Sequence, residues 1–160
     1  MIDADGLNLL SKNIELLKVR KKKECDTVIT PHPLEFARLF DCDIKDRKHQ
    51  DIQFIKKLSD KYGIIIVAKD ARTITADGKD AFINPYGNSG MAKAGSGDML
   101  AGVVGGLLFP MRNPLLASVC AVGIHGLAGD YAAKHYSEYT LNSAIVLESI
   151  GAVIDSLKNI

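Results

Sequence analysis

The chain has no excess of charge of either sign and no apolar run long enough to cross a membrane. Its 160 residues include 20 Lys and Arg against 19 Asp and Glu, which gives a formal net charge of +1. This balance does not favour nucleic acid or an anionic membrane surface as a partner. Glycines and Pro110 interrupt the longest apolar run. We therefore expect neither nucleic-acid binding nor membrane insertion.

Cysteine is also scarce. Cys25, Cys42 and Cys120 are odd in number and lack the spacing of metal ligands. This pattern predicts free thiols in a reducing cytoplasm. The apolar fraction of 47% and the charged fraction of 24% are those of an ordinary globular protein. The length fits one domain over residues 1–160.

The order of apolar segments predicts the fold class. Short β-branched or apolar runs predict strands at 27–30, 64–68, 73–76 and 81–84, with the stub of another at 1–2. Helices are expected at 7–17, 34–40, 52–58, 96–108, 114–136 and 142–158. The strand–helix–strand order of the first half predicts an α/β fold with a mainly parallel sheet flanked by helices.

Polar residues follow the predicted strand ends. They are Asp3 and Asp5, His32, Lys69 and the glycine-rich segment after Asn84. In open α/β sheets, ligands bind outside the carboxyl ends of the strands. The sequence therefore predicts that these connections face one ligand crevice.

The most informative segment is Gly95-Ser96-Gly97-Asp98, which leads directly into the apolar run 99–108. A glycine-rich turn that opens a helix presents unpaired N–H groups and the positive end of the helix dipole to an anion. Asp98 adds a carboxylate that could take a proton from a group reacting with phosphate. The alternative is that Asp98 only caps the helix while the glycines allow close packing.

Two further segments contain candidate ligand contacts. His32 stands between Pro31 and Pro33, on a loop stiffened by both prolines, although it could simply pack on the following helix. Lys69 can place its ammonium on phosphate oxygens, and Thr73 can donate a hydroxyl hydrogen bond. A plain surface loop is the alternative for residues 69–73.

The other histidines are predicted to be structural. The polar surroundings of His49 and His135 predict exposed side chains. His125 lies in an apolar helical stretch and is expected to be a satisfied core histidine.

Taken in order, these motifs resemble one family. They are Asp3-Ala-Asp-Gly-Leu-Asn, Thr30-Pro-His-Pro-x-Glu, Lys69-x-x-x-Thr73 and Gly87-Asn-x-Gly-Met-Ala-x-x-Gly-Ser-Gly-Asp-x-Leu-Ala-Gly. The chain resembles the carboxyl-terminal two-thirds of the ADP- or ATP-dependent NAD(P)H-hydrate dehydratases, in the ribokinase-like superfamily. The His-Pro and Gly-Asn-x-Gly-Met-Ala motifs separate this family from sugar and vitamin kinases.

The resemblance implies a repair enzyme that returns hydrated NADH or NADPH to the normal cofactor and consumes ADP or ATP with Mg²⁺. It implies that Asp98 is catalytic and contacts the substrate, that Gly95, Ser96 and Gly97 form an anion hole, and that His32 contacts the hydrated dinucleotide. It also implies nucleotide binding by Lys69, Asp70, Ala71, Arg72, Thr73 and Gly97. It identifies no metal ligand.

Two alternatives to this function remain. One is a ribokinase-like small-molecule kinase, and the other is a non-catalytic nucleotide-binding remnant. Asp70 stands where the family usually has glycine, which brings a carboxylate near the expected phosphates. Because family members carry an amino-terminal portion before the Asp-Ala-Asp segment, we expect a piece of a longer enzyme. We also expect either a homo-oligomer or association with that portion.

Overall fold

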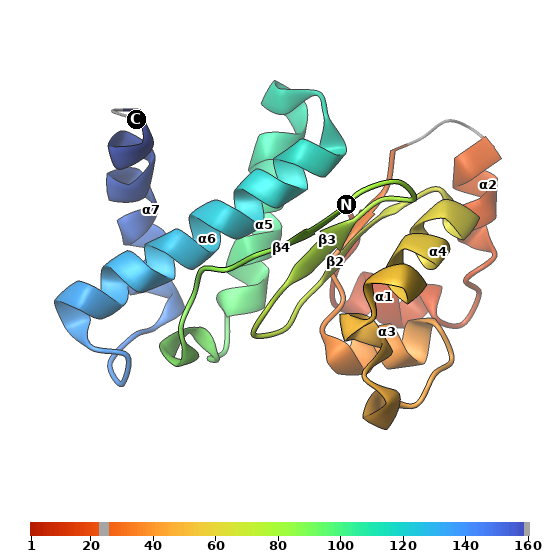
Figure 1. Cartoon of the computed structure of the whole chain (residues 1–160), viewed down its shortest axis with the longest axis horizontal. Helices are drawn as coiled ribbons and strands as arrows, with labels where there is room; N and C mark the ends of the chain where they lie inside the picture. The colour runs from red at the N-terminus through yellow and green to blue at the C-terminus, as the bar shows by residue number, and fades with distance from the viewer. Residues whose placement is uncertain (23–25, 159–160) are drawn as a thin grey trace.

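The computed structural model describes residues 1–22 and 26–158 (Figure 1). Its helices are α1 (Asp5–Leu10), α2 (Leu16–Lys22), α3 (Pro33–Leu39), α4 (Ile52–Tyr62), α5 (Ser96–Met111), α6 (Pro114–Tyr136) and α7 (Ser143–Leu157). Its strands are β1 (Val28–Ile29), β2 (Ile65–Ala68), β3 (Ile74–Ala76) and β4 (Ala81–Ile83). Short 3-10 helices are η1 (Ile44–Asp46), η2 (Lys48–Gln50) and η3 (Ser89–Met91).

The element order follows the sequence prediction closely, with one correction. The single helix expected over 7–17 is wrong, because α1 ends at Leu10 and α2 begins at Leu16. Ser11 Oγ donates to the Asn8 carbonyl, and the Asn13 N–H donates to Leu10. Such local bonds compete with the helical pattern and explain the break.

The sheet is mixed. Its order is β1-β2-β3-β4, with β1 parallel to β2 and the two later pairings antiparallel. Ile2 adds a parallel bridge to Ile29 at the other edge. The predicted parallel character therefore holds for the first strands. The connections after β2 and β3 are too short for a crossover helix, so they return as antiparallel hairpins.

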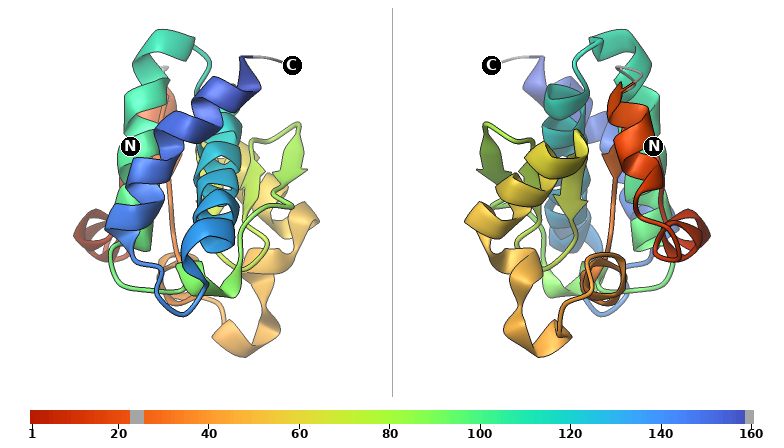
Figure 2. Two further views of the ribbon diagram at one scale, coloured as in Figure 1. Left: turned by 90° about the vertical axis from the view of Figure 1, so that its left-hand side faces the viewer. Right: turned by 90° about the vertical axis from the view of Figure 1, so that its right-hand side faces the viewer.

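Helices cover both faces of the sheet (Figures 1 and 2). Alternate residues of β1 and β2 point to opposite faces, as the pleat requires. Ile29 and Ile66 pack in a core with α1–α4, whereas Val28 and Val67 pack against α5 and α6. A third cluster joins α6 to α7, which stands beside the carboxyl-terminal half of α6 in Figure 1.

Local signals fix the helix boundaries. Pro33 begins α3, as expected, and Asn142 caps α7 by accepting a hydrogen bond from the Ile145 N–H, also as expected. Asn113 caps α6 in the same way and is followed by a proline at the first helical position. Gly63 ends α4 in the left-handed conformation that favours glycine.

Within the described parts of the chain, one helix has the length and composition of a membrane span. This helix is α6, with 23 residues, and half of its apolar stretch is buried inside the molecule. The expectation that no apolar segment is long enough to cross a membrane therefore does not hold for α6, by length and composition alone. Buried core helices share these properties, so the feature is weak evidence for a membrane.

Candidate functional site

Three connections at the strand ends meet through one ammonium group. Lys69 follows β2, and its Nζ donates to Asp3 Oδ1 over 3.0 Å. Glu35 Oε2, from the first turn of α3, lies 3.9 Å from the same Nζ. All three side chains are largely shielded, so the pairs are screened less than surface ion pairs. The predicted convergence of strand-end groups is confirmed for Asp3 and Lys69.

His32 caps helix α3. Its Nδ1 accepts hydrogen bonds from the N–H groups of Leu34 and Glu35, at 3.1 and 3.2 Å. Glu35 completes a reciprocal capping box by accepting from the His32 N–H over 2.7 Å. The half-exposed ring is thus held from one side, and its Nε2 lies 3.4 Å from Glu35 Oε1. His32 therefore packs on the following helix, which was the structural alternative, and the outer edge of its ring remains accessible.

The turn before α5 presents unpaired donors. Gly95 caps the helix with a φ of 84° and without a side-chain hydrogen bond. Met99 N–H returns to the Gly95 carbonyl, but no acceptor in the described chain pairs with the N–H groups of Gly97 and Asp98. A Cβ on Gly97 would stand 3.4 Å from Lys69 Nζ. Free amides, the helix dipole and an ammonium group therefore gather at one point, which suits an anion.

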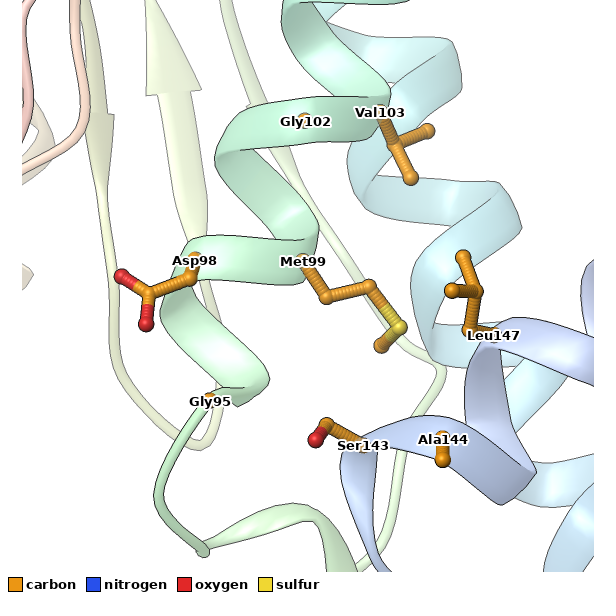
Figure 3. Close-up of a pocket in the computed structure, with 8 residues that line it drawn as sticks. All are labelled: Gly95, Asp98, Met99, Gly102, Val103, Ser143, Ala144 and Leu147. Carbon is orange, nitrogen blue, oxygen red and sulfur yellow. The ribbon is translucent and has the colours of Figure 1, made fainter.

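Asp98 lies in the first turn of α5, and its exposed carboxylate has no partner among residues 1–22 and 26–158. It borders an open cavity of about 640 Å³ between α5 and α7 (Figure 3). Met99, Val103 and Leu147 face this cavity, whereas Asp98 points away from α7. An acceptor for a proton thus stands beside the free amides and at the rim of an apolar space.

The turn at 69–73 is closed by its own hydrogen bonds. Thr73 Oγ1 donates to the Asp70 carbonyl over 3.1 Å, and the Asp70 carboxylate accepts from the Ala71 N–H over 2.7 Å. Ala71 and Arg72 are exposed, and Arg72 donates to the Pro85 carbonyl. These residues form one compact turn next to Lys69.

Asp70 is held by the element that precedes α4. His49 Nε2 lies 2.9 Å from Asp70 Oδ2, and Gln50 donates to the same oxygen. Burial alone would raise the pKa of Asp70, but bonds from Ala71, Gln50 and His49 outweigh it and hold the pKa below its ordinary value. The prediction that His49 is exposed is wrong, because the ring is buried against this carboxylate.

His125 is a buried histidine, as predicted, and it contacts the candidate anion site. Its Nε2 lies 3.4 Å from Ser96 Oγ at the start of α5. Burial lowers the pKa of His125 to about 4, although a hydrogen bond to the Ser96 backbone works in the opposite direction. The ring is therefore neutral at physiological pH. The predicted exposure of His135 is also confirmed.

Several polar groups near the site have no sequence signal that would assign them. Asp130 accepts two hydrogen bonds from the glycine-rich loop, and Ser143 stands against Gly95. Thr30 Oγ1, fully buried at the end of β1, has no hydrogen-bond partner in the described residues. These groups are brought together only by tertiary packing.

The residues present fit a nucleotide whose Mg²⁺ is bound mainly through phosphate. Among residues 1–22 and 26–158, no three acidic, histidine or cysteine side chains gather as a metal site. Mg²⁺ is commonly held by one or two carboxylates, water and substrate phosphates. Asp98 supplies one such carboxylate beside free amides, which fits an ion bound mainly through phosphate.

The fold and site define a ribokinase-like α/β protein, with a glycine-rich turn and an aspartate at the start of a helix. A ribokinase-like protein from Enterococcus faecalis shares the fold, at 27% identity over 97% of this chain and 51% of its own, with a TM-score of 0.75. The sequence profile described as NAD(P)H-hydrate dehydratase matches residues 1–150. The chain belongs to the NAD(P)H-hydrate dehydratase family.

Named relatives agree. The bifunctional NAD(P)H-hydrate repair enzyme Nnr of Moorella thermoacetica is 33% identical, over 99% of this chain and 29% of its own length. A Bacillus subtilis ADP/ATP-dependent NAD(P)H-hydrate dehydratase, co-crystallised with ATP/Mg²⁺, has a TM-score of 0.76 and 28% identity over 81% of this chain. The chain covers 47% of that structure. It thus spans half or less of the length of these two relatives.

Proposed function

We propose that this chain contributes the phosphate-handling part of a nucleotide-dependent NAD(P)H-hydrate dehydratase, which returns hydrated NADH or NADPH to the normal cofactor. The observation that carries the proposal is the unpaired Asp98 carboxylate beside the free amides of Gly97 and Asp98. On this reading, residues 1–160 form part of one ribokinase-like domain. Membership of the family and the relatives' names support the substrate class.

In the first step the hydroxyl oxygen of the hydrate attacks the terminal phosphorus of ADP or ATP. An O–P bond forms there, and the bond to the nucleotide's bridging oxygen breaks, so the nucleotide leaves with one phosphate fewer. Asp98 accepts the hydroxyl proton. The free amides of Gly97 and Asp98, at the end of the turn that begins at Gly95, stabilise the charge that spreads over the transferring phosphoryl oxygens.

In the second step the C–O bond to the new phosphate breaks, and phosphate leaves with the bonding electrons. A proton lost from the neighbouring ring carbon restores the double bond of the reduced nicotinamide. The overall result is that the hydrate loses the elements of water: its hydroxyl oxygen leaves within the phosphate, and the nucleotide shortened by one phosphate is the remaining product. No oxidant is needed, because the ring keeps its oxidation state.

The nucleotide is proposed to lie along the 69–73 turn and Gly97. Lys69 brings a positive charge to the phosphates, Thr73 and Asp70 keep the turn compact, and Ala71 and Arg72 are exposed to a ligand. Mg²⁺ bound with the nucleotide would neutralise phosphate charge. His32 would contact the hydrated dinucleotide through its accessible edge.

We also propose that another polypeptide segment covers the apolar face formed by α5 and α7. Leu147 and Ile154 of α7 are exposed, and Phe109 of α5 is 85% exposed. A Cβ on Gly102 or Gly151 would meet nothing within 4 Å. Large exposed apolar patches mark interaction surfaces. A second copy of the chain, or the portion of the relatives' fold that this chain does not match, would cover this face. We place the resulting assembly in the cytoplasm.

The test is an assay of hydrated NADH with ADP or ATP and Mg²⁺. It uses the chain alone and the chain supplemented with the part of the Bacillus subtilis relative that it does not match. Recovery of reduced-nicotinamide absorbance with phosphate release supports the dehydratase. A phosphorylated hydrate that persists would indicate a kinase. Nucleotide binding without turnover in both arrangements would indicate a non-catalytic remnant.

Asp98→Asn is the decisive variant. We expect turnover to fall at least about 100-fold, because a positioned general base commonly contributes that much, while the Kd for ADP stays nearly unchanged. Asp80→Asn, at an exposed carboxylate in the β3–β4 connection, is the matched control. Undiminished turnover in Asp98→Asn would remove Asp98 from the proposed role.

A further inference from the structure

One face of α6 contacts the glycine-rich loop that leads to the anion site. The residues of this helix face have no part in the proposed chemistry. His125, Gly126, Gly129 and Asp130 recur at positions one and four apart, so they lie on one side of the helix. The loop runs from Tyr86 through η3 to Gly95, beside the carboxyl-terminal half of α6 (Figure 1).

Two glycines let the α6 backbone touch this loop directly. A Cβ on Gly126 would lie 2.8 Å from Tyr86 Cβ and 2.9 Å from its carbonyl carbon. A Cβ on Gly129 would lie 2.1 Å from Met91 Sδ. Gly126 has no room for a side chain unless the loop backbone at Tyr86 moves, whereas at Gly129 the flexible Met91 side chain would have to move. The helix and the loop backbone therefore have a fixed separation at Gly126.

Asp130 ties the start of the loop to α6. Its Oδ2 accepts from the Gly87 N–H over 2.9 Å, and its Oδ1 accepts from Asn88 Nδ2 over 3.0 Å. Asn88 Oδ1 in turn accepts from the Gly90 N–H and caps η3. Gly87 has a φ of 107°, a conformation that requires glycine, so these bonds hold a backbone that would otherwise be free to vary.

His125 contacts the other end of the same loop. Its buried ring touches Ser96, the residue between the two glycines of the anion turn. The same helix thus holds the loop at Gly87 and Asn88 and again at Ser96. Between these points lie only the short η3 and residues 92–95, and the Gly97 and Asp98 amides follow directly after Ser96.

We infer that Asp130 is a positioning residue, which sets the direction of the Gly97 and Asp98 N–H groups through the loop that it holds. It touches no reacting atom. Preorganised donors stabilise charge because they need not reorient during the reaction. The inference rests on the proposed function for its catalytic meaning, but the structural link between Asp130 and the amides can be tested without turnover.

The test is an exchange of partners. Asp130→Asn leaves one acceptor oxygen for two donors, the Gly87 N–H and the Asn88 side-chain NH₂. One of these two donors therefore loses its hydrogen bond. Adding Asn88→Asp restores both bonds. The amide introduced at position 130 accepts from the Gly87 N–H through its oxygen, and its NH₂ donates to the carboxylate introduced at position 88. The net charge of the double variant equals that of the wild type. Glu148→Gln, on an exposed position of α7, is the control for charge.

Nuclear magnetic resonance with ¹⁵N-labelled full chain supplies the readout that needs no activity. Asp130→Asn is expected to shift the amide signals of Gly87, Gly97 and Asp98, and to speed hydrogen exchange at Gly87, whose N–H is the one bonded to Asp130. The double variant is expected to return them toward the wild type. ADP titration should show a Kd raised about tenfold in the single variant and recovered in the double one.

The results separate the two proposals. If only the Gly87 signal moves and the Gly97 and Asp98 signals stay unchanged, Asp130 is merely a local contact and the inference is overturned. Loss of melting temperature without recovery of the amide signals in the double variant would also overturn it. If the amides respond as expected but the wild type neither binds ADP nor turns over hydrate, the positioning role stands and the proposed function fails.

Discussion

The turn after β2 and the turn before α5 lie side by side but differ in how they use their own donors. The 69–73 turn pairs its polar groups internally through Asp70 and Thr73, and His49 and Gln50 add bonds to the Asp70 carboxylate. The 95–98 turn leaves two amides free and is held from outside, by Ser143 and His125. A turn whose N–H and O–H groups are hydrogen-bonded within the turn is stable but offers few donors to a ligand. A turn that keeps them free needs neighbours to hold its shape.

The largest expected effect comes from breaking the externally held turn. Gly95→Val places a β-branched side chain at a φ of 84°, and the first added carbon meets Ser143 Oγ at 2.9 Å. Strain and overlap together should lower the free energy of unfolding by about 3 kcal/mol and abolish ADP binding. Chemical denaturation and calorimetric titration measure the two effects.

The control for that change is Gly123→Ala, since a Cβ on Gly123 meets nothing within 4 Å. An alanine inside a helix is expected to be neutral or to stabilise by up to about 1 kcal/mol. Equal damage from both variants would contradict a special role for the Gly95 conformation.

The second prediction concerns His125, which supports the externally held turn. The pKa of His125 is lowered from 6.5 to about 4, so the unfolded chain binds a proton between these values and the folded chain does not. Stability should therefore fall as pH drops from 6.5 to about 4, with a contribution of roughly 3 kcal/mol. His125→Gln cannot take the proton and should lose this part of the pH dependence.

Denaturant unfolding at several pH values between 7 and 4 measures the difference between the two proteins. Other groups titrate in both the wild type and His125→Gln, so their contributions to the pH dependence of stability cancel in the comparison. Identical slopes for wild type and His125→Gln would show that the buried ring is not the source.

The third prediction tests the link between the turns. Lys69→Met removes the ammonium beside Gly97 and leaves Asp3 and Glu35 without their shared cation. We expect the Kd for ADP to rise about tenfold, and its salt dependence to weaken, because one charge contact to phosphate is lost. Lys79→Met, at an exposed position in the β3–β4 connection, should change neither.

The smallest expected effect comes from the internally closed turn. Asp70→Asn weakens the bonds to His49, Gln50 and Ala71 and should cost about 1 kcal/mol at neutral pH. Because the pKa of Asp70 is lowered below 3.8, this stabilisation is present above that pH and is lost as pH falls through the lower folded value. The two proteins should therefore converge in stability once the pH falls below that lowered pKa. A loss of ADP binding as large as that of Gly95→Val would end the distinction between the turns.

The sequence predicted the parts of the fold and site that depend on local patterns. The Ile64–Ala68 run, Pro33, Asn142 and the Gly95–Asp98 turn carry their signals in adjacent residues, and the elements appear where expected. The break between α1 and α2 was missed, because the apolar spacing continues across it while Ser11 and Asn13 end the helix by local hydrogen bonds.

Long-range contacts could not be predicted in the same way. His49 lies among polar residues in the chain, yet it is buried because Asp70, 21 positions later, packs against it. Asp130 is separated from Gly87 by 43 positions. Such pairs depend on how helices pack on the sheet, and no periodicity in one segment records its partner.

The capping of α3 by His32 has a consequence for recognition. Because Nδ1 accepts from two backbone N–H groups, it cannot hold a hydrogen, and the neutral ring must keep its hydrogen on Nε2. This tautomer is fixed before any ligand arrives. Its Nε2–H is therefore a hydrogen-bond donor 3.4 Å from Glu35 Oε1, and a ligand atom that takes this hydrogen in place of Glu35 must be an acceptor, such as a carbonyl, hydroxyl or phosphate oxygen.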